Sequence, residues 1–219
     1  MVCGYGMRSA LHALARIAFV FLLGVFPATR PLLADPFLME PLIVGIDVGK
    51  GIFRLDLLAQ NVGDSAPHAD AVERHRDGVG AAGRQATAPS IKAETGFDPR
   101  TGHSEKLVIL FEGAALRAVL DLSYFYAAEA EKEGRRFHER GVWQAYRNGQ
   151  QVDRGSFISD SDDGHFRLSV LPRAPFDRLE LSATPYISED GVEIAPGLIL
   201  TDSSDFLLRR IAYISAPPQ

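Results

Sequence analysis

Residues 141–157 read GVWQAYRNGQQVDRGSF, in which two alternating segments flank the dipeptide Asn148-Gly149. Asn-Gly readily takes the two positive φ angles of a type I′ turn, which joins adjacent antiparallel strands. With these two residues as the loop, Trp143 would face Arg154 and point into a core, while Tyr146 would lie on the opposite, polar face. The segment therefore predicts a β-hairpin that packs on further strands, because a lone hairpin is marginally stable in water.

Apolar residues alternate with polar ones in several other segments, which is the period-two pattern of half-buried strands. These segments are residues 53–57, 106–111 (a continuous apolar run), 116–124, 166–170, 179–183 and 206–214. Short strands at hairpin-like spacing predict an all-β fold, an antiparallel β-sandwich over about residues 42–215. Between them, we expect residues 61–104 to form a long polar loop in which only short pieces, such as 78–80, touch the core. The charged segment 127–140 predicts a short helix or a solvated loop.

The N-terminus, residues 1–34, is typical of an export signal. Two arginines precede the apolar run 17–25, and small residues follow it. The run is shorter than the ~20 apolar residues of a membrane-spanning helix. We therefore expect a secreted or periplasmic protein whose mature chain, residues 35–219, is one domain without a membrane span. The alternative is a misassigned start, with synthesis beginning at Met39.

The composition restricts the class of partner. The 219 residues are 46% hydrophobic and carry a net charge of −5. This mild acidity argues against nucleic acid, which normally requires a basic face. The single cysteine, Cys3, excludes an internal disulfide and would leave with the signal.

Five short motifs occur in one order along the chain. They are DGVG at 77–80, SEKLVILF at 104–111, GVWQAY at 141–146, FDRLELSA at 176–183 and DSSDFLL at 202–208. Together they resemble a bacterial extracellular β-sandwich module, jelly-roll-like, of the kind found in secreted proteins and RTX-type adhesins. The resemblance covers about residues 77–214, and it implies a fold and an extracellular setting without an enzymatic role. The segment between 80 and 104 departs from it, being longer and less acidic.

Acidic residues gather in two places. Calcium takes ~6–8 oxygen ligands, which Asp and Ser side chains in turns can supply. We expect Asp202 and Asp205, in TDSSDF, to bind calcium, the alternative being that they only form a turn. The second group, Asp160, Asp162 and Asp163 in SDSDDGHF, is typical of a solvated hairpin tip.

Flat aromatic rings are the candidates for ligand binding, because ring faces cover the apolar C–H patches of a sugar. Tyr126, Tyr146 and Tyr186 are the ligand-binding candidates, whereas Trp143 is assigned to the core. No histidine spacing matches a zinc site, and no G-x-S-x-G motif is present. Exposed strand faces would account for Glu180, one of two glutamates nearest to an apolar strand setting.

The leading interpretation is a non-catalytic extracellular binding or adhesion module, possessing a carbohydrate site and stabilised by calcium. Its partner would be an extracellular glycan or an envelope protein. One alternative is a structural module of an envelope or matrix assembly that has no small ligand. The other is a hydrolase that acts on polysaccharide, since paired carboxylates can meet in space without a sequence signature.

Overall fold

The structure is a computed structural model that describes residues 55–83, 93–132, 134–193 and 203–216. The predicted export signal lies outside these residues. Within them the regular secondary structure is antiparallel β-strand, apart from one short 3₁₀ helix, Ala69–Ala71. None of the helical structure described there is long and apolar enough to cross a membrane. The all-β class predicted from the sequence is confirmed.

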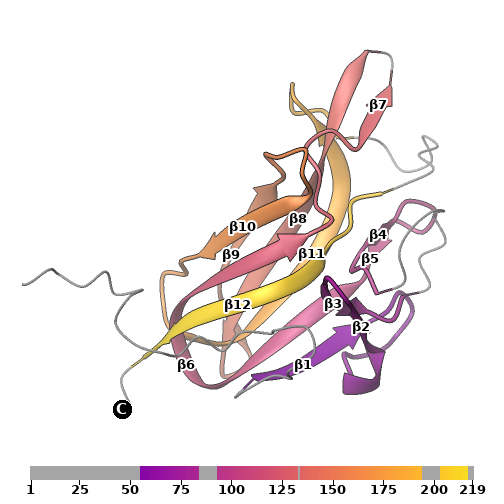
Figure 1. Cartoon of the computed structure of the whole chain (residues 1–219). Helices are drawn as coiled ribbons and strands as arrows, with labels where there is room; N and C mark the ends of the chain where they lie inside the picture. The colour runs from indigo at the N-terminus through magenta and orange to yellow at the C-terminus, as the bar shows by residue number, and fades with distance from the viewer. Residues whose placement is uncertain (1–54, 84–92, 133, 194–202, 217–219) are drawn as a thin grey trace, which may run out of the picture. The chain divides into compact units, whose positions relative to one another are not determined.

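The described ranges contain twelve strands (Figure 1). They are β1 (Leu55–Gln60), β2 (Val72–His75), β3 (Gly78–Ala81), β4 (Phe97–Asp98), β5 (His103–Ser104), β6 (Lys106–Ser123), β7 (Ala130–Lys132), β8 (Arg135–Arg147), β9 (Gln150–Ile158), β10 (His165–Val170), β11 (Phe176–Ser188) and β12 (Leu207–Ser215). β4 and β5 form a separate two-stranded sheet, and the other strands are hydrogen-bonded into one continuous sheet.

The long strand β6 connects the two halves of that sheet. Its first part pairs with β1 and β11, and its second part pairs with β10 and β12. The partners change at residues 112–114, where Glu112 and Gly113 are exposed. Figure 1 shows β6 turning there, so that its second part lies between β10 and β12. Strands β11, β8 and β9 extend one half, and β12, β3 and β2 extend the other.

One hydrophobic core lies between the two halves. Ile109, Trp143 and Leu181 contribute from the half that contains β8, and Leu120 and Ile211 contribute from the other. Burial alternates along β8, as expected for a strand with one face on a core. The antiparallel β-sandwich is therefore confirmed, including the inward position of Trp143.

The central hairpin has the predicted turn but a different register. Asn148 and Gly149 have φ angles of 52° and 79°, as a type I′ turn requires. Beyond Tyr146 the pairing shifts by one residue, so that Trp143 faces Gly155 rather than Arg154. A Cβ atom at position 155 would lie 2.6 Å from the indole ring, so the shift places a glycine where the large ring needs room.

Two predicted loops are strands in the structure. The described part of residues 61–104 contributes β2 to β5, and all four residues of β3 are buried. Val79 and Ala81 belong to the core, which confirms that this piece touches it. Small residues gave β3 too weak an apolar pattern to be recognised as a strand. The charged segment 127–140 forms the β7–β8 hairpin instead of a helix, because Phe137 and Glu139 alternate inward.

Candidate ligand-binding cleft

A polar cleft of about 350 Å³ is formed by four segments that are far apart in the sequence. They are the β2–β3 turn, the end of β6 with the residues that follow it, the turn before β10, and the beginning of β12. The lining residues are Arg76, Asp77, Ser123, Tyr124, Tyr126, Asp163, Gly164, His165 and Arg209.

Tyr124 and Tyr126 are positioned by the buried residue between them. Phe125 is fully buried, and its ring centroid lies 5.3 Å from those of both Phe157 and Phe166. The two tyrosines on either side of it are only half-buried. Tyr124 has a φ of 59°, in the left-handed region that bulky residues rarely adopt. The aromatic packing of Phe125 therefore fixes a strained segment that directs two tyrosines toward the cleft.

Asp77 connects the β2–β3 turn to the end of β6. The Tyr124 hydroxyl donates to Asp77 Oδ2 at 2.8 Å, and Arg76 Nε donates to the same oxygen at 3.0 Å. The Ser123 hydroxyl donates to the Asp77 carbonyl oxygen at 2.8 Å. The hydrogen bond from Tyr124, followed by that from Arg76, lowers the pKa of the Asp77 carboxyl. The same bond raises the pKa of Tyr124, so the cleft holds an ionised carboxylate beside a neutral phenol.

Asp163 is held by its own turn. Its Oδ1 accepts hydrogen bonds from the Ser161 hydroxyl at 2.7 Å and from the backbone N–H of His165 at 2.8 Å. The bond from His165, and then that from Ser161, lowers the pKa of the Asp163 carboxyl. Gly164 has a φ of 73°, and a Cβ atom there would lie 2.6 Å from the Tyr126 ring. This turn therefore supplies a second ionised carboxylate and packs against Tyr126.

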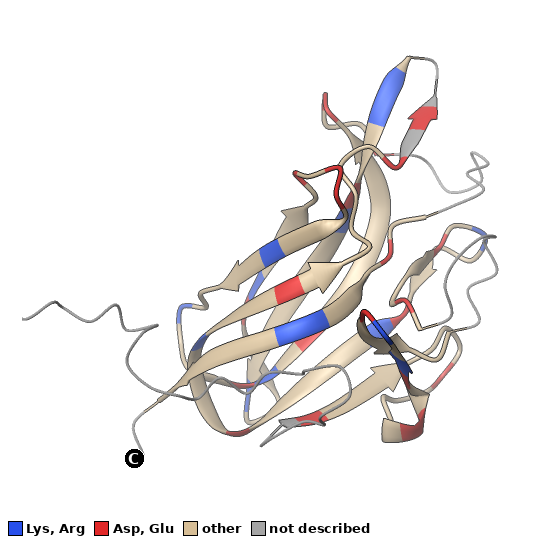
Figure 2. Ribbon diagram, viewed as in Figure 1, with Lys and Arg blue, Asp and Glu red and all other residues tan. Residues whose placement is uncertain are grey.

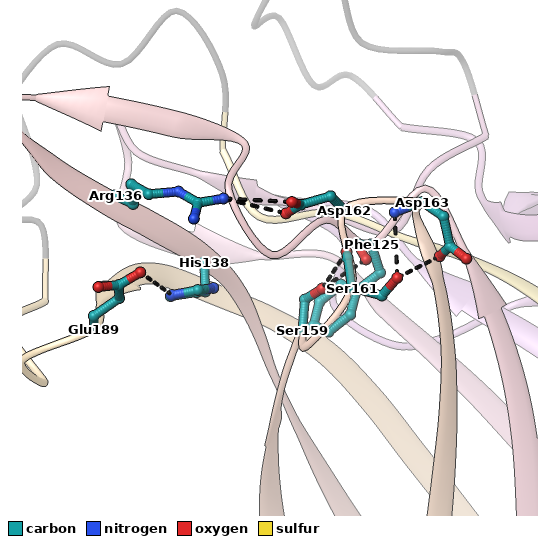
Figure 3. Close-up of polar contacts among 8 residues, drawn as sticks. All are labelled: Phe125, Arg136, His138, Ser159, Ser161, Asp162, Asp163 and Glu189. Atoms are coloured by element: carbon teal, nitrogen blue, oxygen red, sulfur yellow. Dashed lines mark hydrogen bonds and ion pairs between the residues drawn. The ribbon is translucent and has the colours of Figure 1, made fainter.

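The same turn is attached to the segment that carries the tyrosines (Figure 3). The Ser159 hydroxyl donates to the Phe125 carbonyl oxygen at 2.7 Å, and the Phe125 N–H donates to the Gly164 carbonyl oxygen at 3.1 Å. On its outer side, Asp162 pairs with Arg136 of β8 at 3.4 Å. Backbone and side-chain bonds thus hold two walls of the cleft together.

A buried glutamate fixes the backbone of Tyr126. Glu139 is 1% exposed, and its carboxylate accepts hydrogen bonds from the backbone N–H groups of Tyr126 and Asp205, the latter at 2.8 Å. The Glu139 N–H also donates to the Tyr126 carbonyl oxygen at 3.1 Å. One side chain of β8 therefore binds two connecting segments, one of which carries a ring of the cleft.

The predicted ligand-binding tyrosines do not come together. Tyr126 lines the cleft. Tyr146 lies on the outer face of β8, where its hydroxyl donates to Gln144 at 3.2 Å and the Arg178 guanidinium lies 5.3 Å from its ring centroid. Tyr186 is 1% exposed, so its ring presents no face to a ligand. This corrects its assignment, because the side chain is buried on β11.

The predicted calcium pair is only partly described. Asp202 lies outside the described residues, and Asp205 is buried. The segment around Asp205 is bonded to residues 95–97: the Thr95 N–H donates to the Phe206 carbonyl oxygen at 2.9 Å, and the Phe97 N–H to that of Ser204 at 3.0 Å. In the described part of the chain, no three His, Cys, Asp or Glu side chains are grouped so as to hold a metal ion. The calcium role stays a prediction.

Two further predictions concerned acidic residues, one for the hairpin tip at 160–163 and one for Glu180. The tip residues Asp160, Asp162 and Asp163 are exposed, as predicted for a solvated tip, although Asp163 also lines the cleft. Glu180 is not on an exposed face: it is buried and pairs with Lys106 Nζ at 2.7 Å and with the Arg178 guanidinium. Lys106 belongs to the neighbouring strand β6, so the sequence of β11 alone does not reveal this charge partner, whereas Arg178 lies two residues away on β11 itself.

No family model matches the sequence, and no curated protein matches it. Among solved structures, the chain is similar to the C-terminal domain of a chitobiase from Bacteroides fragilis, with a TM-score of 0.28 and 11% sequence identity. The match covers 51% of this chain and 63% of that one. This likeness is too distant to carry an argument about the ligand.

Proposed function

We propose that the protein is a non-catalytic binding module whose cleft holds a carbohydrate. The observation that carries this proposal is the presence of two half-buried tyrosines, Tyr124 and Tyr126, beside two ionised carboxylates in one cleft. A pyranose has apolar C–H faces, which flat rings can cover, and a rim of hydroxyl groups, which carboxylates bind strongly. The cleft volume of about 350 Å³ falls within the ~300–1,000 Å³ of small-molecule sites and suits a short sugar segment.

The state of the carboxylates favours binding over hydrolysis. A glycosidase requires one protonated carboxyl as the general acid and one ionised carboxylate. In the cleft, hydrogen bonds lower the pKa of both Asp77 and Asp163, so both remain ionised at neutral pH. Such carboxylates accept hydrogen bonds from sugar hydroxyls but do not protonate a leaving group.

A glycan array followed by titration calorimetry tests this function. We expect Tyr126→Ala to weaken binding several-fold, because aromatic contacts contribute about 0.5–1.5 kcal/mol beyond the area that they bury. Tyr146→Ala is the matched control, since it removes the same side chain from the outer face of β8.

Each alternative has its own outcome in this experiment. Absence of binding to any glycan would favour the structural module without a small ligand. Release of reducing ends from a bound polysaccharide would favour the hydrolase. An equal loss of affinity in Tyr146→Ala would move the site to the outer face of β8.

The proposal includes an extracellular or periplasmic setting, in which a glycan or an envelope protein is accessible and the module can act in adhesion. Its support is the signal-like sequence of residues 1–34. Expression of the full chain in a Gram-negative host should yield a stable product that lacks this segment. N-terminal sequencing that finds Met1 or Met39 on the product would reject the export.

A further inference from the structure

One cationic side chain of the cleft, that of Arg209, lies at an irregularity in the pairing of strand β12. Along β12, Leu208 pairs with Leu122 of β6, and Arg210 pairs with the preceding residue of β6, Asp121. Arg209 is therefore an extra residue in β12, a β-bulge. Arg209 and Arg210 are consecutive and both exposed, which breaks the alternation of the strand. Bulges of this kind often redirect a side chain beside a functional site, and Arg209 lines the cleft.

The charges around Arg209 are already engaged with other groups. Asp77 accepts hydrogen bonds from Tyr124 and Arg76, and Asp163 accepts them from its own turn. Arg209 makes no hydrogen bond or ion pair with any residue that the structure describes. A guanidinium group that faces a cleft without a partner is suited to an anion from outside.

The neighbouring arginines have a different environment. On the outer face, Arg167 of β10 pairs with Asp121 of β6 at 2.7 Å, and Arg210 of β12 lies opposite the same aspartate in the register. Figure 2 shows this row of basic, acidic and basic residues across β10, β6 and β12. Arg167 and Arg210 in this row therefore both have Asp121 as their neighbour on β6, whereas Arg209 lines the cleft.

We infer that the ligand of this cleft is an acidic glycan, and that Arg209 binds the carboxylate group of a uronic acid unit in it. The inference rests on the proposed function and names its ligand class. The guanidinium fork matches a carboxylate through two parallel hydrogen bonds. Tyr126 would cover the face of the sugar ring, and Asp163, held ionised by its turn, would accept from its hydroxyl groups.

Matched ligands and matched variants test the inference. Oligogalacturonate and oligomannuronate are titrated against their own methyl esters, which keep the sugar backbone and lose the charge. We expect one of the acids to bind the wild type about tenfold or more tightly than its ester, as for a hydrogen-bonded charge pair. Added salt should weaken binding of that acid more than binding of the ester. Arg209→Gln should abolish the preference, while Arg210→Gln, the same change at the next residue, should keep it.

The outcomes separate this inference from the proposed function. Equal binding of acid and ester, or an equal loss in Arg209→Gln and Arg210→Gln, overturns the acidic ligand and leaves the carbohydrate site in place. Tighter binding of a sulfated oligosaccharide than of either uronate overturns the assignment of the carboxylate. If no acid, ester or neutral oligosaccharide binds, both the inference and the proposed function fail. Coincident thermal unfolding of both variants and the wild type confirms that they are folded.

Discussion

Substitution of the buried Glu139 tests how the backbone around the cleft is held together. The side chain is 1% exposed, and its two carboxylate oxygens accept hydrogen bonds from the backbone N–H groups of Tyr126 and Asp205. Glu139→Ala leaves both amides without this acceptor. Each buried donor that loses its partner costs about 1–3 kcal/mol, so the expected loss is about 2–6 kcal/mol. A domain of this kind is stable by only ~5–15 kcal/mol, so the loss should be large in proportion.

Urea unfolding followed by tryptophan fluorescence measures this effect, because the protein has a single tryptophan, Trp143, in its core. Glu139→Gln keeps one acceptor oxygen and should lose roughly half as much as Glu139→Ala. Glu112→Ala removes an exposed glutamate at the bend of β6 and should stay within about 0.5 kcal/mol of the wild type. If Glu139→Ala unfolds at the same urea concentration as Glu112→Ala, the Glu139 carboxylate does not stabilise the two segments that it contacts.

Three further predictions concern packing, pH and calcium. Gly155→Ala should destabilise the protein by about 1–3 kcal/mol, because the new methyl group meets the Trp143 ring, whereas Gly113→Ala, with open space around it, should be nearly neutral in urea unfolding. The lowered pKa of Asp77 means that its stabilising contact is fully present above the unfolded value of about 3.9 and is lost as pH falls through the folded pKa. Asp77→Asn should therefore reduce the steepness of the acid-side loss of stability in a pH series of melting curves; an unchanged acid limb would contradict this. If calcium binds at Asp205, the melting temperature should rise in millimolar calcium relative to chelator, and Asp205→Ala should lose that rise. Identical melting in calcium and chelator would leave Asp205 as part of a structural segment only.

Local patterns in the sequence were sufficient for the longer strands, but not for the short strands β2 to β5 and β7. The Asn148-Gly149 turn is specified by two adjacent residues, and alternation places Trp143 inward whatever the partner strand does. The register of the hairpin could not be predicted from local patterns, because the shift beyond Tyr146 depends on contact between the indole ring and Gly155 across the hairpin. Burial of Tyr186 likewise depends on which face of β11 meets the core, which its own segment does not state.

The cleft itself was not predicted, although one of its lining residues, Tyr126, was among the candidate ligand-binding rings. Its walls come from segments around positions 77, 124, 164 and 209, and no local pattern says that these segments meet. Two features of the sequence could have indicated it: the consecutive rings of Tyr124, Phe125 and Tyr126 after a strand, and the consecutive arginines Arg209 and Arg210 near the beginning of β12. Both break a strict alternation, as residues at functional sites often do.

The most direct test of the central claim is to map where a sugar binds. Two-dimensional amide NMR of the protein, titrated with an oligosaccharide that binds on the array, reports every backbone position that responds. We expect the largest shifts at Tyr124, Tyr126, Gly164 and Arg209, and no shift at Tyr146. Shifts centred on the outer face of β8, with the cleft residues unchanged, would contradict this expectation.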